Sequence, residues 1–298
     1  MAMAVASSAT PKLKASAYYE LTKPGITLAV VLSTAAGYVL ALPVGLWGLG
    51  EQLGHFVLTL LGTLLVSAGS GALNHYAEWT TDRLMPRTRK RPIAAGVLTP
   101  QQGLAWGIAL CTVGLGILLF VDFLLLLLAT VTVVLYIVVY TPMKRRSAAA
   151  LYLGAIPGAL PAAGGWIAAR GPDWGAVLVF GVLYLWQLPH FLALAWLYRK
   201  DYERAGFPVI SLGELGERRV GRQLVGSSLG LAIAGVLVGV YVGASLLFLL
   251  GSLLLAAFLL VLAAGFWRHP SFAAARRVLY GAYVYLFGFV ALAIVARA

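Results

Sequence analysis

Long apolar runs without charge constrain this chain more than any other feature of its sequence. Runs of about 20 residues recur along most of the chain. At a rise of 1.5 Å per helical residue, each could cross a hydrocarbon layer about 30 Å thick. The alternating segments of about 10 residues that a transmembrane barrel needs do not occur. Because every backbone polar group inside a bilayer needs an internal partner, the chain is predicted to be an all-α polytopic membrane protein.

The composition excludes several other classes of protein. With 61% hydrophobic and 11% charged residues, the chain is not a water-soluble enzyme. Its one cysteine, Cys111, excludes intrachain disulfides and thiolate metal clusters. The net charge of +12 does not predict a nucleic-acid partner, because the Lys and Arg residues lie between apolar spans rather than in one tract.

Nine spans account for the apolar runs. The uncharged run from Gln223 to Trp267 has 45 residues, too long for one helix, so we expect it to turn near Gly243, Ala244 and Ser245. Asp122 marks a similar turn in the run from Gln101 to Met143. The expected spans are about 26–45, 54–75, 103–121, 123–141, 148–168, 174–197, 224–242, 246–266 and 278–296.

The basic residues give these spans an orientation. On this map 20 of the 22 Lys and Arg fall on one face, and only Arg170 and Arg297 fall on the other. The positive-inside rule then places the amino terminus in the cytoplasm and the carboxyl terminus outside. We expect one integral domain over residues 1–298, in which residues 1–20 form a flexible cytoplasmic tail.

Polar residues gather at the cytoplasmic end of the second span. Asn74, Glu78 and Asp82 are spaced by four residues, which on a helix keeps them on one face with a drift of about 40° per step. Two carboxylates and an amide oxygen suit Mg²⁺. Pro86 is expected to end the helix, and the guanidinium groups of Arg87, Arg89 and Arg91 after it suit phosphate oxygens. The alternative is a helix end with scattered charges among lipid headgroups, since topology alone would also place arginines here.

A second polar cluster, from Tyr198 to Arg204, follows the sixth span on the same face. Together with the first cluster it could hold a diphosphate from two sides through bridging Mg²⁺. Lys23, Lys144 and Arg145 could complete a collar of positive charge around that diphosphate.

These residues carry a family resemblance. The stretch 74–92 resembles the first aspartate-rich motif of the UbiA superfamily of intramembrane prenyltransferases. The stretches 21–25, 140–145 and 186–191, followed by 201–208, are similar to the branch of that superfamily that modifies heme. Glu78 stands where many members have Asp. In the second motif Ala205 replaces a second Asp, and Glu203 is the nearest carboxylate.

The resemblance implies transfer of the farnesyl group of farnesyl diphosphate to a vinyl group of heme B, with addition of water, to make heme O. It implies Mg²⁺ as cofactor and the inner (cytoplasmic) membrane as location, with an active site that faces the cytoplasm. Implied partners are farnesyl diphosphate, heme B, membrane lipid, and heme A synthase or an assembly partner of heme-copper oxidases. The implied catalytic residues and metal ligands are Asn74, Glu78, Asp82 and Asp201. The implied substrate-binding residues are Lys23, Arg83, Arg87, Arg91, Lys144, Arg145, Gln187, His190, Lys200, Tyr202 and Glu203.

His190 is the one histidine expected within a span and away from its ends. It precedes Asp201 by 11 residues, about three turns, so the two would share a face if the helix were continuous. Gln187 lies one turn further along. One reading is that His190 hydrogen-bonds a carbonyl freed by Pro189. The other, which the resemblance favours, is that His190 and Gln187 contact the porphyrin.

Two other functions are compatible with parts of this pattern. A related prenyltransferase that acts on an aromatic or quinone precursor would share the fold and the metal chemistry. A small membrane transporter would share nine spans and a basic face, but it should carry ionisable residues or broken helices near the midplane of two related halves. The acidic residues of this chain instead gather at one interface.

Overall fold

The computed structural model describes residues 11–43, 49–50, 52–213 and 215–295. Within these residues nine helices are long and apolar enough to cross a membrane, and no strand occurs, so the predicted fold class and number of spans are confirmed. The fourth span, Phe123–Met143, is built from α5 (Phe123–Val134), the π-helical η2 (Leu135–Tyr140) and α6 (Thr141–Met143). The other spans are α2 (Pro24–Ala41), α3 (Leu53–Asp82), α4 (Pro100–Val121), α7 (Ala150–Arg170), α8 (Trp174–Leu197), α10 (Gly216–Tyr241), α11 (Leu246–Arg268) and α12 (Phe272–Val295).

The boundaries differ from the prediction in a few places. Helix α3 continues seven residues past its predicted end at 75, and α10 begins at Gly216 rather than near 224. Residues 44 and 45 of the first predicted span, and 296 of the last, lie outside the described residues. So do residues 1–10 of the predicted tail, whereas Pro11–Leu21 form helix α1. Ala17 and Leu21 of α1 are buried against the α3–α4 loop, in a cluster with Ile93 and Leu98.

The two expected hairpin turns are present. Asp122 caps α5, because its carboxylate accepts hydrogen bonds from the backbone N–H groups of Leu124 at 2.7 Å and Leu125 at 3.1 Å. Gly243 turns the chain between α10 and α11 with a φ of +64°, a conformation that suits glycine.

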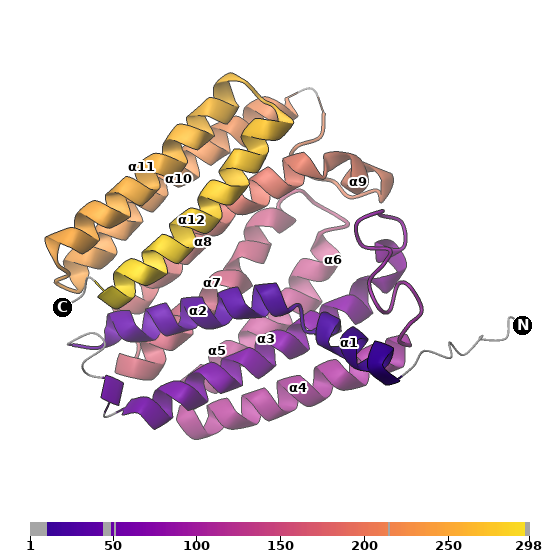
Figure 1. The fold of residues 1–298 in the computed structure, drawn as a ribbon, viewed down its shortest axis with the longest axis horizontal. Helices are drawn as coiled ribbons and strands as arrows, with labels where there is room; N and C mark the ends of the chain where they lie inside the picture. Colours follow the sequence, from indigo (N-terminus) through magenta and orange to yellow (C-terminus); the bar gives the residue numbers. More distant parts are fainter. Residues whose placement is uncertain (1–10, 44–48, 51, 214, 296–298) are drawn as a thin grey trace, which may run out of the picture.

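Helices α2 and α7 pack closely through small residues. A Cβ placed on Gly37 would lie 2.0 Å from the carbonyl oxygen of Ala162, and one placed on Gly165 would lie 2.0 Å from that of Thr34. Neither position has room for a larger residue, and the two glycines therefore set the distance between these backbones. In Figure 1, α7 lies between α3, α4 and α5 on one side and α8, α10, α11 and α12 on the other.

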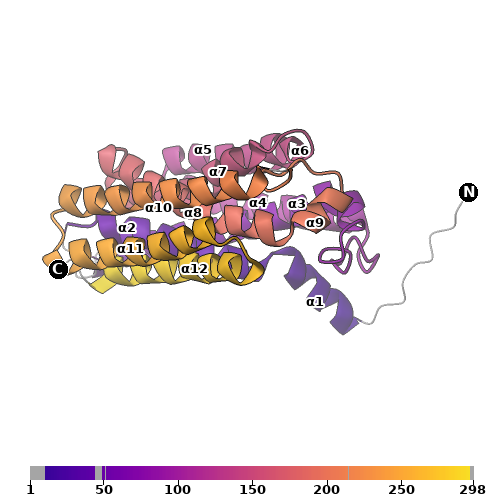
Figure 2. The same cartoon turned by 90° about the horizontal axis from the view of Figure 1, so that it is seen from above.

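The polar segments gather at one end of the bundle. Figures 1 and 2 show α1, the loop after α3, α6 and α9 (Arg199–Arg204) at that end, while α12 finishes at the other. The elements that carry both predicted polar motifs are thus brought to one end of the spans.

Candidate active site

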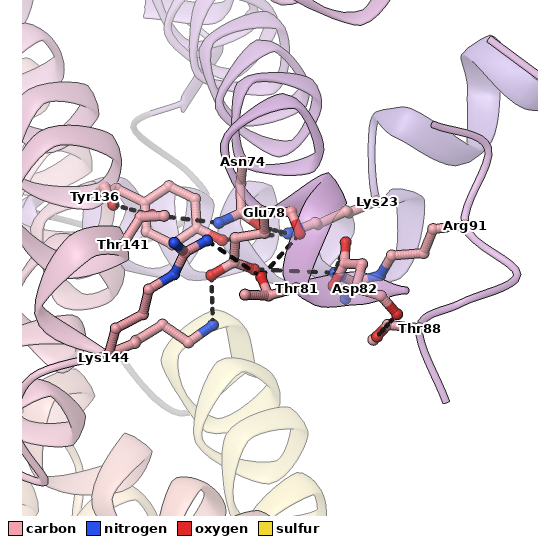
Figure 3. A network of polar contacts seen from close by, with 11 residues as sticks. Lys23, Asn74, Glu78, Thr81, Asp82, Thr88, Arg91, Tyr136, Thr141 and Lys144 are labelled. Carbon is pink, nitrogen blue, oxygen red and sulfur yellow. Dashed lines mark hydrogen bonds and ion pairs between the residues drawn. The ribbon is translucent and has the colours of Figure 1, made fainter. Parts of the chain in front are cut away.

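Helix α3 presents three polar side chains that are all buried: Asn74, Glu78 and Asp82 (Figure 3). The helix ends at Asp82 because Pro86 has no N–H to donate to the Asp82 carbonyl. The Thr88 hydroxyl donates to that carbonyl instead, at 2.9 Å. Pro86 therefore acts as predicted, and the three side chains occupy the last turns of a helix whose end is fixed.

Each of these side chains is held by a cation from another part of the chain. Lys144, directly after α6, lies 2.7 Å from the Glu78 carboxylate. Arg91, in the loop after α3, donates from Nη1 to both Asp82 oxygens at 2.8 and 2.9 Å, and lies 3.9 Å from Glu78. Lys23, ahead of α2, donates to the Asn74 Oδ1 at 2.5 Å. Three cations thus surround two carboxylates.

The pKa values of Lys23 and Lys144 are shifted in opposite directions. Burial, and after it the Arg91 guanidinium, lowers the pKa of Lys23 to about 7. Burial also opposes the charge of Lys144, but Tyr140 and the Glu78 carboxylate outweigh it and raise the pKa of that lysine above its ordinary value. The excess positive charge around Lys23 makes this end of the site suited to an additional anion.

An apolar cavity of about 640 Å³ lies next to this cluster. Lys23, Ser70, Tyr136 and Tyr140 line its polar end, and Lys23 also donates to the Tyr136 hydroxyl at 3.3 Å. The remaining wall is largely apolar and comes from α2, α3, α5, α7, α8 and α12, with Leu118 from α4. The volume lies in the range of small-molecule and cofactor sites. A charged cluster therefore adjoins a chamber suited to an apolar group.

Gln187 and His190 both line this cavity. The Gln187 amide donates to the carbonyls of Ala155 and Leu183, each at 3.1 Å. The His190 ring stacks on Trp186 at 5.6 Å and meets the edge of Tyr283 at 5.0 Å. Its Nδ1 is buried and has no hydrogen-bond partner among the described residues. The reading in which this nitrogen bonds a carbonyl freed by Pro189 thus finds no support.

The second polar motif approaches the first through aromatic residues. The Arg87 guanidinium lies over the Tyr198 ring at 4.8 Å, and Lys144 Nζ lies 5.9 Å from the Phe207 ring. Tyr202 joins Lys144 in lining a smaller cavity of about 190 Å³.

The second motif has an ion pair of its own. Asp201 has its ion pair with Arg204, at 3.7 Å. Helix α8 ends at Leu197, as predicted for the sixth span, and the short α9 begins at Arg199, so the continuous helix that would put His190 and Asp201 on one face is not present. Lys200 and Glu203 are exposed. A ligand role for Asp201 therefore stays a prediction.

Two predicted arginines hold loops together. Arg83 donates to the Ala94 carbonyl at 3.0 Å and lies over the Trp79 ring at 4.5 Å. Arg145 donates to the Thr81 hydroxyl at 3.4 Å. These contacts are made on the protein itself, and binding of substrate by either residue stays a prediction.

Sequence reasoning missed several residues of the site. Tyr136 and Tyr140 stack at 5.7 Å in η2, Thr141 bonds Asn74, and Tyr283 comes from the last span. Tyr140 and Thr141 lie in the stretch 140–145 that carries the family resemblance, and the spacing of two tyrosines by four residues was a further signal. Among the described residues no three His, Cys, Asp or Glu side chains are grouped to hold a metal, so a metal here would use amide and substrate oxygens as well.

Comparison with known proteins defines the family. A profile of the UbiA prenyltransferase family matches residues 30–294. The chain belongs to this family. A relative from Salinibacter ruber, named protoheme IX farnesyltransferase, is 38% identical over 280 residues, which cover 93% of this chain and 97% of the relative. A relative of the same name from Sorangium cellulosum is 43% identical over 202 residues, covering 65% of this chain and 72% of the relative.

Solved structures of UbiA homologues share the fold. One from Aeropyrum pernix has a TM-score of 0.71 at 19% identity, covering 88% of this chain and 97% of that chain. One from Archaeoglobus fulgidus, solved with GPP and Mg²⁺ bound, has a TM-score of 0.69 at 16% identity, covering 93% of this chain and 99% of that chain. The arrangement of spans is therefore that of UbiA proteins.

Proposed function

We propose that this chain transfers the farnesyl group of farnesyl diphosphate to a vinyl group of heme B, with addition of water, to give heme O. One observation carries the proposal: a buried cluster with excess positive charge adjoins an apolar cavity of about 640 Å³. A prenyl diphosphate has the same division into an anionic head and an apolar chain. The names of the curated relatives supply the acceptor.

The residues of α3 fit a Mg²⁺ ion. Asn74 Oδ1 and the carboxylates of Glu78 and Asp82 are hard oxygen ligands on one helix face, and all three side chains are buried. Arg91 and Lys144 could move from the carboxylates to oxygens of a bound diphosphate. The carboxylates of Asp82 and Glu78 would then be free to ligate the metal. Bound there, Mg²⁺ would neutralise charge on the diphosphate. Asp201 would add a ligand from the second motif.

The protein's own cations assist departure of the leaving group. When the bond between the farnesyl C1 and the diphosphate oxygen breaks, both electrons go to the diphosphate. Lys23, Arg91 and Lys144 would stabilise that charge from positions already fixed by the fold. The allylic cation lies in the apolar cavity, where few water molecules compete with the vinyl carbon for it.

The acceptor would occupy the part of the cavity near His190 and Gln187. The vinyl carbon forms a bond to the farnesyl C1, and water then adds to the cation left next to the macrocycle and loses one proton to the solvent, which leaves the hydroxyl group. The rings of Trp186, His190 and Tyr283 pack together and line this part of the cavity, and their aromatic surfaces suit a flat conjugated ring. The unpartnered His190 Nδ1 could ligate iron or hold the water.

The location follows from the same charges. We place the polar end of the bundle in the cytoplasm, in an inner membrane, because nearly all basic residues lie at that end. A hydrophobic product would pass through the bilayer to heme A synthase or to an oxidase assembly partner.

The decisive experiment incubates the detergent-solubilised protein with heme B, farnesyl diphosphate and Mg²⁺, and then determines the mass of the heme. A heme heavier by one farnesyl group and one water is the expected product. Unchanged heme, together with prenylation of an aromatic acid or quinone precursor supplied in parallel, would assign the protein to another acceptor.

A further inference from the structure

An asparagine can coordinate a metal ion only through its side-chain oxygen. The side-chain amide of Asn74 can rotate by half a turn with almost no change of shape, which would exchange Oδ1 for Nδ2. Only the oxygen can ligate a cation. Whatever fixes this rotation therefore controls whether the site works.

On one side of Asn74 the partner is a donor. Lys23 Nζ lies 2.5 Å from Oδ1 and donates a hydrogen bond to it. Lys23 is itself held ahead of α2 with a φ of +49°, with Pro24 next in the chain. An amide turned the other way would place two donors against each other.

On the other side the partner can only accept. Asn74 Nδ2 lies 3.3 Å from the Thr141 Oγ1. The Thr141 hydroxyl proton is committed elsewhere, because it is donated to the Tyr136 carbonyl at 2.8 Å. Its oxygen is then left to accept from Nδ2, as Figure 3 shows.

The π-helical segment explains why this carbonyl is in reach. In η2 the Tyr136 carbonyl accepts the backbone N–H of Thr141, five residues on, where an α-helix would use the residue four on. The Tyr136 carbonyl therefore accepts two hydrogen bonds from Thr141, one from its backbone N–H and one from its hydroxyl. The π-helical turn thus determines that the Thr141 hydroxyl donates to this carbonyl and leaves its oxygen as an acceptor.

We infer that Thr141 is a positioning residue that, together with Lys23, holds the Asn74 amide with its oxygen toward the metal and diphosphate. This inference rests on the proposed function. Thr141→Val keeps the shape of the side chain but removes the acceptor, so that the amide would be free to rotate. Thr141→Ser keeps the hydroxyl and is the rescuing variant.

The test measures metal binding as well as turnover. Mn²⁺ is titrated into solubilised protein in the presence of an unreactive thio analogue of farnesyl diphosphate, and bound Mn²⁺ is read by electron paramagnetic resonance. Thr141→Val should weaken Mn²⁺ binding about tenfold and raise the Mg²⁺ needed for half-maximal turnover by a similar factor. Thr141→Ser should stay within about twofold of the unmodified protein.

The control removes a comparable hydroxyl elsewhere in the same span. Thr130 donates to the Leu126 carbonyl at 2.9 Å and is exposed on the outside of α5, so Thr130→Val should change neither measurement. Thermal unfolding of all variants shows whether Thr141→Val is folded. If it is not, the comparison of Thr141→Ser with Thr141→Ala by the same Mn²⁺ titration replaces it.

Three outcomes would overturn the inference. Equal Mn²⁺ affinity in Thr141→Val and the unmodified protein would show that the amide needs no such help, and equal impairment of Thr141→Ser would assign the effect to packing. Absence of Mn²⁺ binding in the unmodified protein would instead remove the proposed metal site, and this inference with it.

Discussion

The indole nitrogen of Trp186 donates a hydrogen bond of 2.5 Å to the backbone carbonyl of Ala282. This bond ties α8 to α12 across 96 residues of sequence. Trp186 stacks on His190, and Tyr283, the neighbour of Ala282, meets the same imidazole ring edge-on. The aromatic cluster around His190 is thus built jointly by the sixth and the last span.

His190→Ala should weaken binding of heme B about tenfold, since it removes the imidazole proposed to ligate the iron or to hold the water. Its affinity for farnesyl diphosphate should stay within about twofold, because the cations proposed to hold the diphosphate are bound to Asn74, Glu78 and Asp82. Asp82→Ala should show the reverse. Heme titration by absorbance and binding of a prenyl diphosphate analogue measure both. His269→Ala, in the exposed segment before α12, is the control. Normal turnover and unchanged heme affinity in His190→Ala would return this residue to a packing role.

Alanine at Asn74, Glu78, Asp82 or Asp201 should each lower turnover about 100-fold or more while the protein stays folded in the membrane. The reason is loss of oxygen ligands. Each change also leaves a cation without its nearest partner: Lys23, Lys144, Arg91 or Arg204, respectively. Excess chelator should abolish turnover and added Mg²⁺ should restore it. Two substitutions of Asp by Asn test the role of the negative charge alone. Asp82→Asn should be inactive, whereas Asp173→Asn, at the start of α8, should retain activity. Full turnover in excess chelator would remove the metal from the mechanism.

The proposed orientation predicts where tags become accessible. Tags at the amino terminus and beside Arg89 should be reached from the cytoplasm, and a tag at Ala298 from the opposite face. The physical reason is the distribution of 20 of 22 basic residues at one end of the spans. Labelling with a membrane-impermeant reagent in intact and permeabilised cells tests this. A cytoplasmic carboxyl terminus would contradict the assignment.

The contact between α2 and α7 predicts a loss of stability. Gly165→Ala would push a methyl group into the Thr34 carbonyl, since its Cβ would lie 2.0 Å away. We expect a cost of about 1–3 kcal/mol, seen as a lower temperature of thermal unfolding in detergent. Gly181→Ala is the control, because a Cβ there meets nothing within 4 Å. Equal unfolding temperatures for the two variants would show that the helices can separate without cost.

The spans and the shared face of Asn74, Glu78 and Asp82 could be predicted from the sequence. Both depend only on the length of an apolar run and on the spacing of residues that are close together in the chain. The sequence also predicted the effect of Pro86, which acts within its own turn. The pairing of Glu78 with Lys144 could not be predicted, since it joins residues 66 positions apart. The end of the sixth span at 197 was predicted correctly, because the apolar run stops where Tyr198 and the charged residues after it begin. The π-helical turn before Thr141 leaves no sign in composition.

Helix α5 forms one side of the cavity. Of its 12 residues only Leu125 is buried, and Leu125, Leu128, Ala129 and Thr132 line the cavity. One helix therefore separates the chamber from the surrounding lipid. Farnesyl diphosphate has an anionic head and a long apolar chain and partitions between water and that lipid, so the amount that reaches the cavity depends on how much lipid is present. The apparent KM for farnesyl diphosphate should then rise as detergent or lipid is added at constant total substrate. The Michaelis constant of this protein for farnesyl diphosphate should therefore be expressed as the amount of substrate per amount of lipid in the bilayer.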